Sequence, residues 1–336
     1  MSETSVKREF GRGERILPGL WRLRLPLPWP GVPHCNAWAI AHGDGIVLVD
    51  CGLHQDDSLA QLERALDQAG FRLEQVRQLV ITHAHTDHWG QAATVVERTG
   101  APLWMHPNTA HARSPVEDPE ASLASKLEIG RQSGVSERAL ERYEGLLRTL
   151  PSGISGLIEP DGLLLDGVVI ESDLGPWHVY ETPGHAPSHV CLFQPERRLL
   201  ISGDHVLGRI SLYFDHGWTP DPIGEFLGSL DVVDALDARL CMSGHGRTFP
   251  DVHAHIEGTR ELVGERLAAG VATLRAKPLT AIEAVPGIYG ETFGSVMAAW
   301  RLSETLCYLE HLERSGAVRR LTTDGVDRWV ATDAQP

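Results

Sequence analysis

The histidine-rich hexapeptide at residues 83–88, HAHTDH, constrains this chain most strongly. It follows the short apolar run 78–82 (QLVIT) and precedes a segment with helical spacing, 90–98, that Gly100 closes. This order predicts a strand, a loop and a helix, with the hexapeptide at the carboxyl end of the strand, where α/β enzymes usually place their ligands. The donor residues within it are His83, His85, Asp87 and His88.

Imidazole nitrogen and carboxylate oxygen are the donor atoms that divalent zinc, iron and manganese accept in proteins. A polar loop with surface histidines is the alternative explanation of the hexapeptide. That alternative does not account for so dense a set of donors, because packing alone gives no reason for it. The hexapeptide therefore predicts a metal site.

Length and charge are those of an ordinary soluble enzyme. The 336 residues exceed a typical single domain, so we expect one large domain and one small one. The net charge of −15 argues against a general affinity for nucleic acid or for anionic membranes. It leaves a small-molecule substrate open, because bound metal ions reverse the local field.

Cysteine usage and the amino-terminal residues predict a cytoplasmic protein. The five cysteines are scattered and none forms a Cys-x-x-Cys pair, so we expect buried, reduced thiols. Residues 1–17 are charged and contain no apolar segment of the signal-peptide type. No run approaches the roughly 18 apolar residues that a membrane span needs.

Short strands and helices alternate along the chain. Residues 57–70 have helical spacing, with leucines on one stripe and Gly70 as a natural stop. We expect Gly43-Asp44-Gly45 to form a tight turn between strands. The expected strands are 20–27 (broken at its prolines), 36–41, 46–49, 78–82, 102–106, 163–165, 168–170, 178–181, 190–193 and 199–201.

Residues 108–150 differ from their surroundings because they are polar and helical in pattern. We expect a helical insertion in this region. The sequence leaves two interpretations open: a lid over the active-site face, or a surface excursion without a role.

The pattern after residue 252 is helical, and it predicts a small second domain. We expect helices over 279–286 and 293–314 and a hairpin over 317–331, an order that resembles a winged helix. The predicted division is therefore 1–275 for the catalytic domain and 276–336 for the winged-helix-like domain. Such modules often bind DNA, but the chain is acidic, so we expect the tail to serve in a homodimer contact or in closing the substrate pocket.

Further candidate ligands follow predicted strand ends, each beside a glycine. His185 follows Thr182-Pro183-Gly184, Asp204 follows Ser202-Gly203, and His245 follows Ser243-Gly244. Glycine lets the backbone approach a site closely. Any one of these residues alone has an ordinary structural explanation, but the ordered set predicts loops that converge on one face of a sheet sandwich.

This ordered set resembles the metallo-β-lactamase-fold hydrolase superfamily, over roughly residues 15–260, with a ligand set like that of glyoxalase II. The tail resembles a subgroup with a carboxyl-terminal helical extension, the lactamase-beta-like group. The resemblance implies an α/β fold, a four-layer αββα sandwich. It also implies that His83, His85 and His185 hold one divalent metal ion, that Asp87, His88 and His245 hold a second, and that Asp204 bridges them.

Departures from other branches of the superfamily narrow the expected chemistry. β-Lactamases lack a bridging aspartate at the position of Asp204, and flavodiiron proteins carry glutamate at that of His85. Quorum-quenching lactonases place a tyrosine three residues after the bridging aspartate, where this chain has Leu207, with Tyr213 only a displaced candidate. The tail differs from the glutathione-binding domain of glyoxalase II.

We therefore expect a dinuclear hydrolase that attacks a small ester, thioester or lactone with a bridging hydroxide, with Asp87 and Asp204 as catalytic residues. Zinc is the expected metal, with iron or manganese as alternatives. Two other functions remain open at this point: a metal-dependent ribonuclease or phosphodiesterase, and a metal-dependent DNA-binding regulator.

Overall fold

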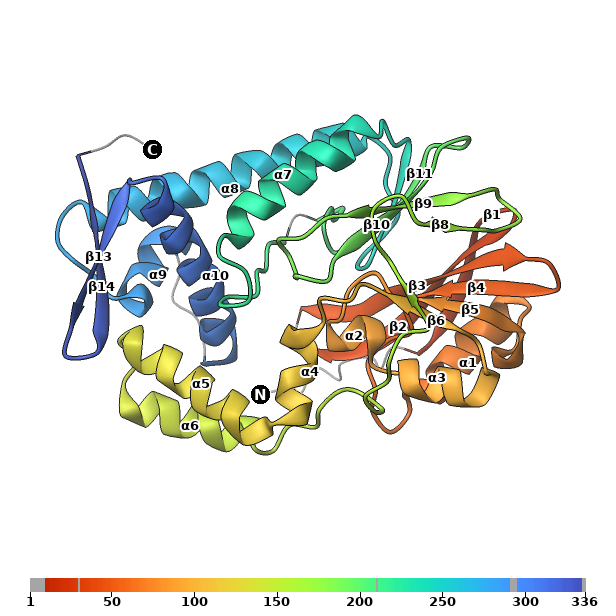
Figure 1. Ribbon diagram of the computed structural model, residues 1–336, viewed down its shortest axis with the longest axis horizontal. Helices are drawn as coiled ribbons and strands as arrows, with labels where there is room; N and C mark the ends of the chain where they lie inside the picture. The colour runs from red at the N-terminus through yellow and green to blue at the C-terminus, as the bar shows by residue number, and fades with distance from the viewer. Residues whose placement is uncertain (1–9, 30, 210, 291–294, 334–336) are drawn as a thin grey trace, which may run out of the picture.

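Two β-sheets pack face to face in the computed structural model, which describes residues 10–29, 31–209, 211–290 and 295–333. Figure 1 shows the sheets with helices on their outer faces. The side chains between the sheets are buried and almost all apolar. The largest of them, Trp38 and Trp177, come one from each sheet, so this shared layer joins both sheets into one core.

The strands of the first sheet lie side by side in chain order. They are β1 (Arg12–Leu17), β2 (Leu20–Trp29), β3 (Val32–His42), β4 (Gly45–Val49), β5 (Val76–Val80), β6 (Leu103–Met105) and β7 (Gly162–Leu163). The second sheet has the order β12 (Leu240–Ser243), β11 (Leu199–Gly203), β10 (Val190–Gln194), β9 (Trp177–Glu181) and β8 (Val169–Ile170). Strands β4, β5 and β6 run parallel, as do β11 and β12, so the loops that follow them leave at shared edges.

Helices cover the outer face of each sheet. On the first sheet they are α1 (Ser58–Ala69), α2 (Thr86–Trp89) and α3 (Ala92–Thr99), with the short 3₁₀ helix η1 (Leu73–Gln75) nearby. On the second sheet they are α7 (Pro222–Ala235) and α8 (Val252–Leu274). The layers are therefore helix, sheet, sheet, helix, which confirms the predicted αββα sandwich and its α/β class.

The predicted helical insertion consists of α4 (Ala110–Glu117), α5 (Pro119–Gln132) and α6 (Glu137–Leu147). Helix α5 begins sharply because the Asp118 side chain accepts a hydrogen bond from the Ala121 amide at 2.9 Å and Pro119 occupies the first helical turn. Leu123, Leu127 and Leu140 are buried between α5 and α6.

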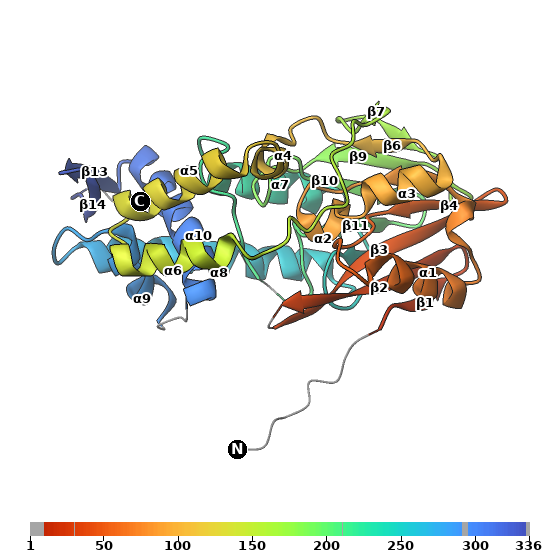
Figure 2. The ribbon, with the colours of Figure 1, turned by 90° about the horizontal axis from the view of Figure 1, so that it is seen from below.

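The tail contains α9 (Ala281–Tyr289), α10 (Ser295–Arg314), β13 (Val318–Thr323) and β14 (Val326–Ala331), in the predicted order of helix, helix and hairpin. Leu279 and Trp329 exchange backbone hydrogen bonds of 3.0 and 2.7 Å, which attach the segment before α9 to β14. The insertion and the tail lie together at one end of the molecule, as Figures 1 and 2 show. The winged-helix assignment and the domain boundary at 275 stay predictions.

Several element boundaries differ from those expected. Strand β2 does not break at Pro26 but continues to Trp29. Among the described residues β1 pairs with it only as far as Arg24, and proline is tolerated on an edge without a pairing strand. Helix α9 ends at Tyr289, before the C-cap residue Gly290 with a φ of 73°, rather than at Pro286. Helix α7 was not expected, and the predicted start of α10 at Phe293 lies outside the described residues.

All five cysteines are buried and unpaired, as expected. Among the described residues, no helix is both long and apolar enough to cross a membrane.

Candidate metal centre

The histidine-rich hexapeptide spans the loop after β5 and the first three residues of α2, at the carboxyl end of a strand as its position in the sequence predicts. His83 follows the strand after two residues, and His85 is the N-cap residue of α2. The α2 helix begins there because the His85 carbonyl accepts a hydrogen bond from the His88 amide at 2.9 Å. This short turn brings Asp87 and His88 back toward His83.

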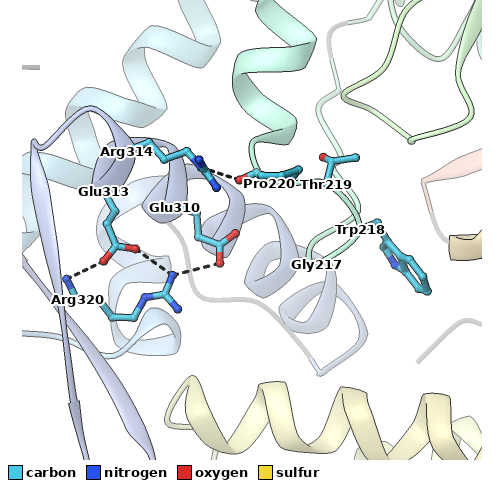
Figure 3. Close-up of a pocket in the computed structure, with 8 residues that line it drawn as sticks. All are labelled: Gly217, Trp218, Thr219, Pro220, Glu310, Glu313, Arg314 and Arg320. Carbon is cyan, nitrogen blue, oxygen red and sulfur yellow. Dashed lines mark hydrogen bonds and ion pairs between the residues drawn. The ribbon is translucent and has the colours of Figure 1, made fainter. Parts of the chain in front are cut away.

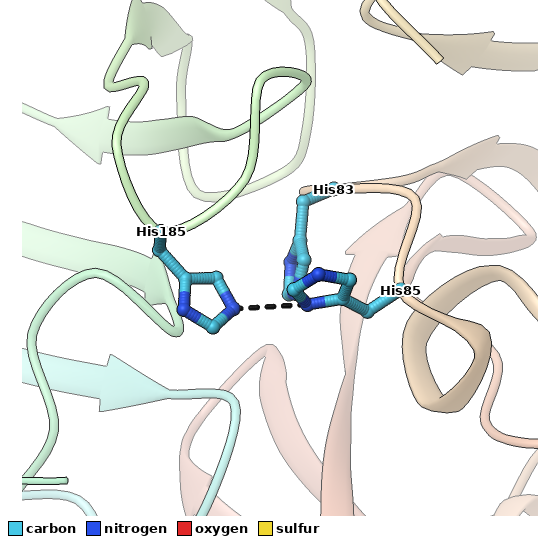
Figure 4. Close-up of side chains that lie close together, drawn as sticks. All are labelled: His83, His85 and His185. Atoms are coloured by element: carbon cyan, nitrogen blue, oxygen red, sulfur yellow. Dashed lines mark hydrogen bonds between the residues drawn. The ribbon is translucent and has the colours of Figure 1, made fainter. Parts of the chain in front are cut away.

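A first group of three imidazoles comes from two loops of the sandwich. His83, His85 and His185 each offer a ring nitrogen, and these atoms all lie within 4.8 Å of one another. His185 Nε2 is 3.0 Å from His85 Nδ1, and Figure 4 shows the three rings converging from the two loops. His185 lies on the loop between β9 and β10. This group has the donors and the spacing for one divalent cation.

A second group lies beside the first. Asp87, His88 and His245 also offer donor atoms within 4.8 Å of one another. Oδ2 of Asp87 is 3.3 Å from His245 Nε2 and 3.6 Å from His88 Nε2. His245 lies just after β12, so the group joins the short helix α2 to a loop of the second sheet.

Asp204 lies between the two groups. Its Oδ2 is 3.1 Å from His245 Nε2 and 3.8 Å from His185 Nε2, while its Oδ1 is 3.5 Å from His88 Nε2. It follows β11 directly, and its backbone amide donates to His189 Nε2 at 3.1 Å. One carboxylate thus contacts imidazoles of both groups, as expected of a bridging ligand.

Unpaired buried atoms show that these residues fit metal ions. His83 Nε2, His88 Nε2 and Asp204 Oδ1 are buried and have no hydrogen-bond partner. Each such atom costs about 1–3 kcal/mol when it is left unsatisfied, and a divalent cation would satisfy all three. The mixture of nitrogen and oxygen donors suits zinc, iron or manganese.

The charges at the site are arranged for cations. Burial raises the pKa of Asp204, but His245 and His88 outweigh it and hold that pKa well below its usual range. Burial lowers the pKa of His245, whereas Asp204 and Asp87 raise it, to about 10. Burial, reinforced by His88, keeps the pKa of His83 well below its usual range. The negative charge of Asp87 and Asp204 can be balanced either by protonated imidazoles or by divalent cations. Metal binding here therefore releases protons from the imidazoles.

Comparison with known proteins identifies the family. The chain matches the family model described as the metallo-beta-lactamase superfamily over residues 30–245, a range that contains all seven candidate ligands. The chain belongs to the metallo-beta-lactamase superfamily. As a member of this superfamily it is a metallo-hydrolase, and the fold implies bound divalent metal ions.

Two similar proteins cover most of the chain, and a third covers a shorter part of it. The probable metallo-hydrolase YqjP of Bacillus subtilis is 25% identical over 297 residues, which span 83% of this chain and 88% of the relative. The crystal structure of the metallo-beta-lactamase family protein TTHA1429 from Thermus thermophilus has a TM-score of 0.81 at 26% identity, covering 95% of this chain and 100% of that one. An atrochrysone carboxyl ACP thioesterase of Aspergillus chevalieri is 28% identical over 99 residues, or 29% of this chain and 30% of that enzyme.

Asp50 also supports the site, and the sequence analysis did not identify it. It follows β4 directly, and its Oδ2 accepts a hydrogen bond from His88 Nδ1 at 2.7 Å. Thr82 donates to the same carboxylate through its amide at 2.8 Å and its hydroxyl at 2.9 Å. A carboxylate directly after an apolar strand was the available signal, the same one that identified Asp204.

Asp215 was also missed, and it supports the first group. Its Oδ2 accepts from His85 Nε2 at 2.9 Å, which leaves Nδ1 of His85 facing His185. Burial raises the pKa of Asp215, but His85 outweighs it, so that pKa is lowered. His111 of the insertion lies 3.6 Å from the same oxygen and 3.0 Å from Ser188 Oγ. No sequence signal identified Asp215.

Backbone carbonyls hold further imidazoles. His185 Nδ1 donates to the Tyr213 carbonyl and His245 Nδ1 to the His34 carbonyl, both at 3.0 Å. His205 and His216 stay outside the site: His205 packs on Phe226 with ring centres 4.7 Å apart, and His216 pairs with Glu310 of α10 at 3.2 Å.

A polar cavity of about 400 Å³ lies between the loop after Tyr213 and the tail, apart from the metal centre. Figure 3 shows that Arg314 and Arg320, the two arginines that line it, are held by hydrogen bonds and ion pairs. Arg320 pairs with Glu310 at 3.2 Å and with Glu313 at 3.1 Å, and Arg314 Nε donates to the Pro220 carbonyl at 2.8 Å. None of the seven candidate ligands lines this cavity.

Proposed function

We propose that this chain hydrolyses a small ester, thioester or lactone with two divalent metal ions, zinc by default. The observation that carries the proposal is the position of Asp204, whose carboxylate lies within 3.8 Å of imidazoles of both ligand groups. We assign the first ion to His83, His85 and His185 and the second to Asp87, His88 and His245, with Asp204 shared.

Two divalent ions bound here would lower the pKa of a water molecule and polarise the scissile carbonyl. Asp87 is the side chain placed to orient that water or accept its proton, because its Oδ2 lies at the centre of the second group. Burial raises the pKa of Asp87, but His88 and His245 outweigh it, so the carboxylate is ionised and able to act as an acceptor. After attack, Asp87 can return the proton to the leaving group.

A thioester is supported by the partial match to the ACP thioesterase, whose name denotes cleavage of the same class of bond. The lactonase tyrosine has no counterpart at Leu207. The ring of Tyr213 nevertheless lies 5.7 Å from that of His85 and 6.0 Å from that of His185, so an aromatic side chain borders the first group from another position in the sequence.

We do not propose DNA binding or RNA cleavage. Two arginines of the tail pair with carboxylates instead of facing solvent alone: Arg320 with Glu310 and Glu313, and Arg328 with Glu283 at 3.9 Å. A small-molecule substrate fits the acidic chain better, because little positive charge remains for a phosphate backbone.

The test replaces His88 or Asp204 by alanine and measures turnover of acetyl thioesters, esters and lactones together with metal content. We expect turnover to be abolished while the circular dichroism spectrum stays that of the parent. Asp44→Ala, at an exposed turn, is the matched control and should keep full activity. Unchanged turnover in metal-replete Asp204→Ala protein would contradict the proposal.

A further inference from the structure

We propose that Trp29, Tyr213 and Trp300 form an aromatic wall that binds an apolar, ring-sized group next to the scissile bond of the substrate. The inference rests on the proposed function, and it narrows the substrate class to compounds that carry such a group. It assigns a binding role to the tail, because Trp300 belongs to α10.

The wall extends outward from the metal centre in a continuous series of ring contacts. The Tyr213 ring is 5.7 Å from that of His85, the Trp300 ring is 6.4 Å from that of Tyr213, and the Trp29 ring is 6.3 Å from that of Trp300. All three contacts are edge-to-face. A group bound against these rings would therefore lie beside the candidate metal site.

The wall is assembled from parts of the chain that are far apart in sequence. Trp29 ends strand β2, Tyr213 lies on the loop before α7, and Trp300 lies on the tail helix. Trp300 remains 36% exposed although it contacts two other aromatic rings. Trp29 and Tyr213 are half-buried. Aromatic side chains that stay partly open beside a site of buried polar ligands have the composition of a ligand pocket, which is mostly apolar with a few convergent polar groups.

The loop that carries Tyr213 is fixed to α10, so the wall has a defined geometry. Ser303 Oγ donates to the Phe214 carbonyl at 3.0 Å and accepts from the His216 amide at 3.3 Å. Ser303 lies one turn after Trp300 on the same helix, so these hydrogen bonds join the helix that carries Trp300 to the loop that carries Tyr213. A preorganised wall binds its ligand without the entropy cost of ordering it.

Product binding tests the wall independently of catalysis. Isothermal titration of the full-length, metal-loaded protein compares phenylacetate with acetate, for a ring on the acyl side, and benzyl alcohol with ethanol, for a ring on the leaving group. We expect the ring to improve affinity by about tenfold or more on one side, as burial of a phenyl group against aromatic side chains allows.

Variants then assign the effect to the wall. Trp300→Ala and Trp29→Ala should each remove most of the preference for the ring compound, whereas Trp300→Phe should retain it. Trp21→Ala is the matched control, because Trp21 packs against Phe71 on the outer face of the first sheet, and it should keep the parental preference. Metal content measured on each sample separates loss of the wall from loss of the metal centre.

Two results overturn the inference: equal binding of the ring and ring-free ligands by the parent, or a preference that survives both Trp300→Ala and Trp29→Ala. The proposed function fails by a different result, when the metal-loaded parent hydrolyses neither acetyl nor phenylacetyl thioesters, esters or lactones. Because the titration does not depend on turnover, the two failures are distinguishable.

Discussion

At the residue scale, carboxylates behind the candidate ligands contact them from the side opposite the site. His88 and His85 each direct one ring nitrogen away from the centre, and that nitrogen donates to a carboxylate. The carboxylate is that of Asp50 for His88 and that of Asp215 for His85. Such partners set which nitrogen faces the metal and increase its basicity. Removing a partner should therefore weaken the metal site while the ligands remain present.

Replacing Asp215 by asparagine should lower metal affinity about 10- to 100-fold, because the amide supports His85 less well than the carboxylate does. Competition with a chromophoric chelator measures the affinity. Asp44→Asn, at an exposed turn, is the control and should leave it unchanged. An Asp215→Asn protein with parental metal affinity would show that the contact has no supporting role.

Gly244 precedes the candidate ligand His245 at a position where any side chain would collide with other ligands. A methyl group at this position would lie 2.1 Å from Asp204 Oδ1 and 2.7 Å from His88 Cε1. Gly244→Ala should therefore displace Asp204 and lower metal affinity by about tenfold or more. The helical Gly228, which has open space around it, provides the control: Gly228→Ala should keep the parental metal affinity and activity. If the Gly244→Ala protein binds metal with the parental affinity, the backbone at this position moves enough to accommodate the methyl group, and the prediction is wrong.

At the scale of elements, α10 is attached to the loop that supports the metal centre. His311 Nδ1 donates to Asp221 Oδ1 at 2.9 Å, and Ser303 contacts the same loop nearer to Tyr213 and Asp215. The tail helix thus holds a segment whose residues contact His85 and His185.

A double variant, Ser303→Ala with His311→Ala, should lower metal affinity by about tenfold because the supporting loop loosens. Metal content and chelator competition provide readouts that do not depend on turnover. Glu313→Ala on the same helix removes only contacts to Arg320 and serves as the control. If the double variant binds metal as the parent does, α10 does not support the centre.

Helix α9 begins with a capping box that has a calculable pH dependence. The Thr280 amide donates to Glu283 Oε2 at 2.9 Å, and this hydrogen bond lowers the pKa of Glu283. Since the folded pKa lies below the unfolded one, the stabilisation is complete above the unfolded value of about 4.3 and is lost as the pH falls through the folded value.

Glu283→Ala should therefore lower the free energy of unfolding by about 1 kcal/mol at neutral pH, and by less at pH values below about 4. Urea denaturation at both pH values measures the difference. The exposed Glu141 of α6 provides a control, since Glu141→Ala should show no such pH-dependent change. A constant difference at both pH values would contradict the assigned role of the carboxylate.

At the scale of the whole molecule, metal ions should join the two halves of the sandwich. The candidate ligands come from loops after β5 and β9 and after β11 and β12, so they belong to both sheets. A ligand that binds only the folded protein stabilises it by about 2.7 kcal/mol at a concentration of 100 times its Kd.

Metal removal should therefore lower the melting temperature by about 5 °C or more, given the usual dependence of melting temperature on free energy for chains of this size. Differential scanning calorimetry before and after chelation, followed by addition of zinc, iron or manganese, measures the shift and identifies the metals that restore it. Identical melting of chelated and metal-loaded protein would contradict strong metal binding.

Much of the architecture was predictable because it depends on local patterns. Alternating apolar runs predicted most strands, and leucine spacing with a terminal glycine predicted α1. Helix α7 was missed: it is apolar along most of its length and lacks the two-faced pattern that marks a surface helix. The course of β2 beyond Pro26 was also missed, because only the pairing register shows that β1, among the described residues, stops at Arg24.

By itself, the sequence determined the candidate ligands, because each stands in a short segment at a strand end whose chemistry can be recognised without its neighbours. How these segments meet follows from the folded chain: Asp204 lies between both groups, Asp215 reaches His85 across 130 positions, and Trp300 of the tail lies beside Tyr213. Such contacts join residues that are distant in the chain, so no local periodicity or motif encodes them. The identity of the donors is therefore a local property, and their geometry and surroundings are global ones.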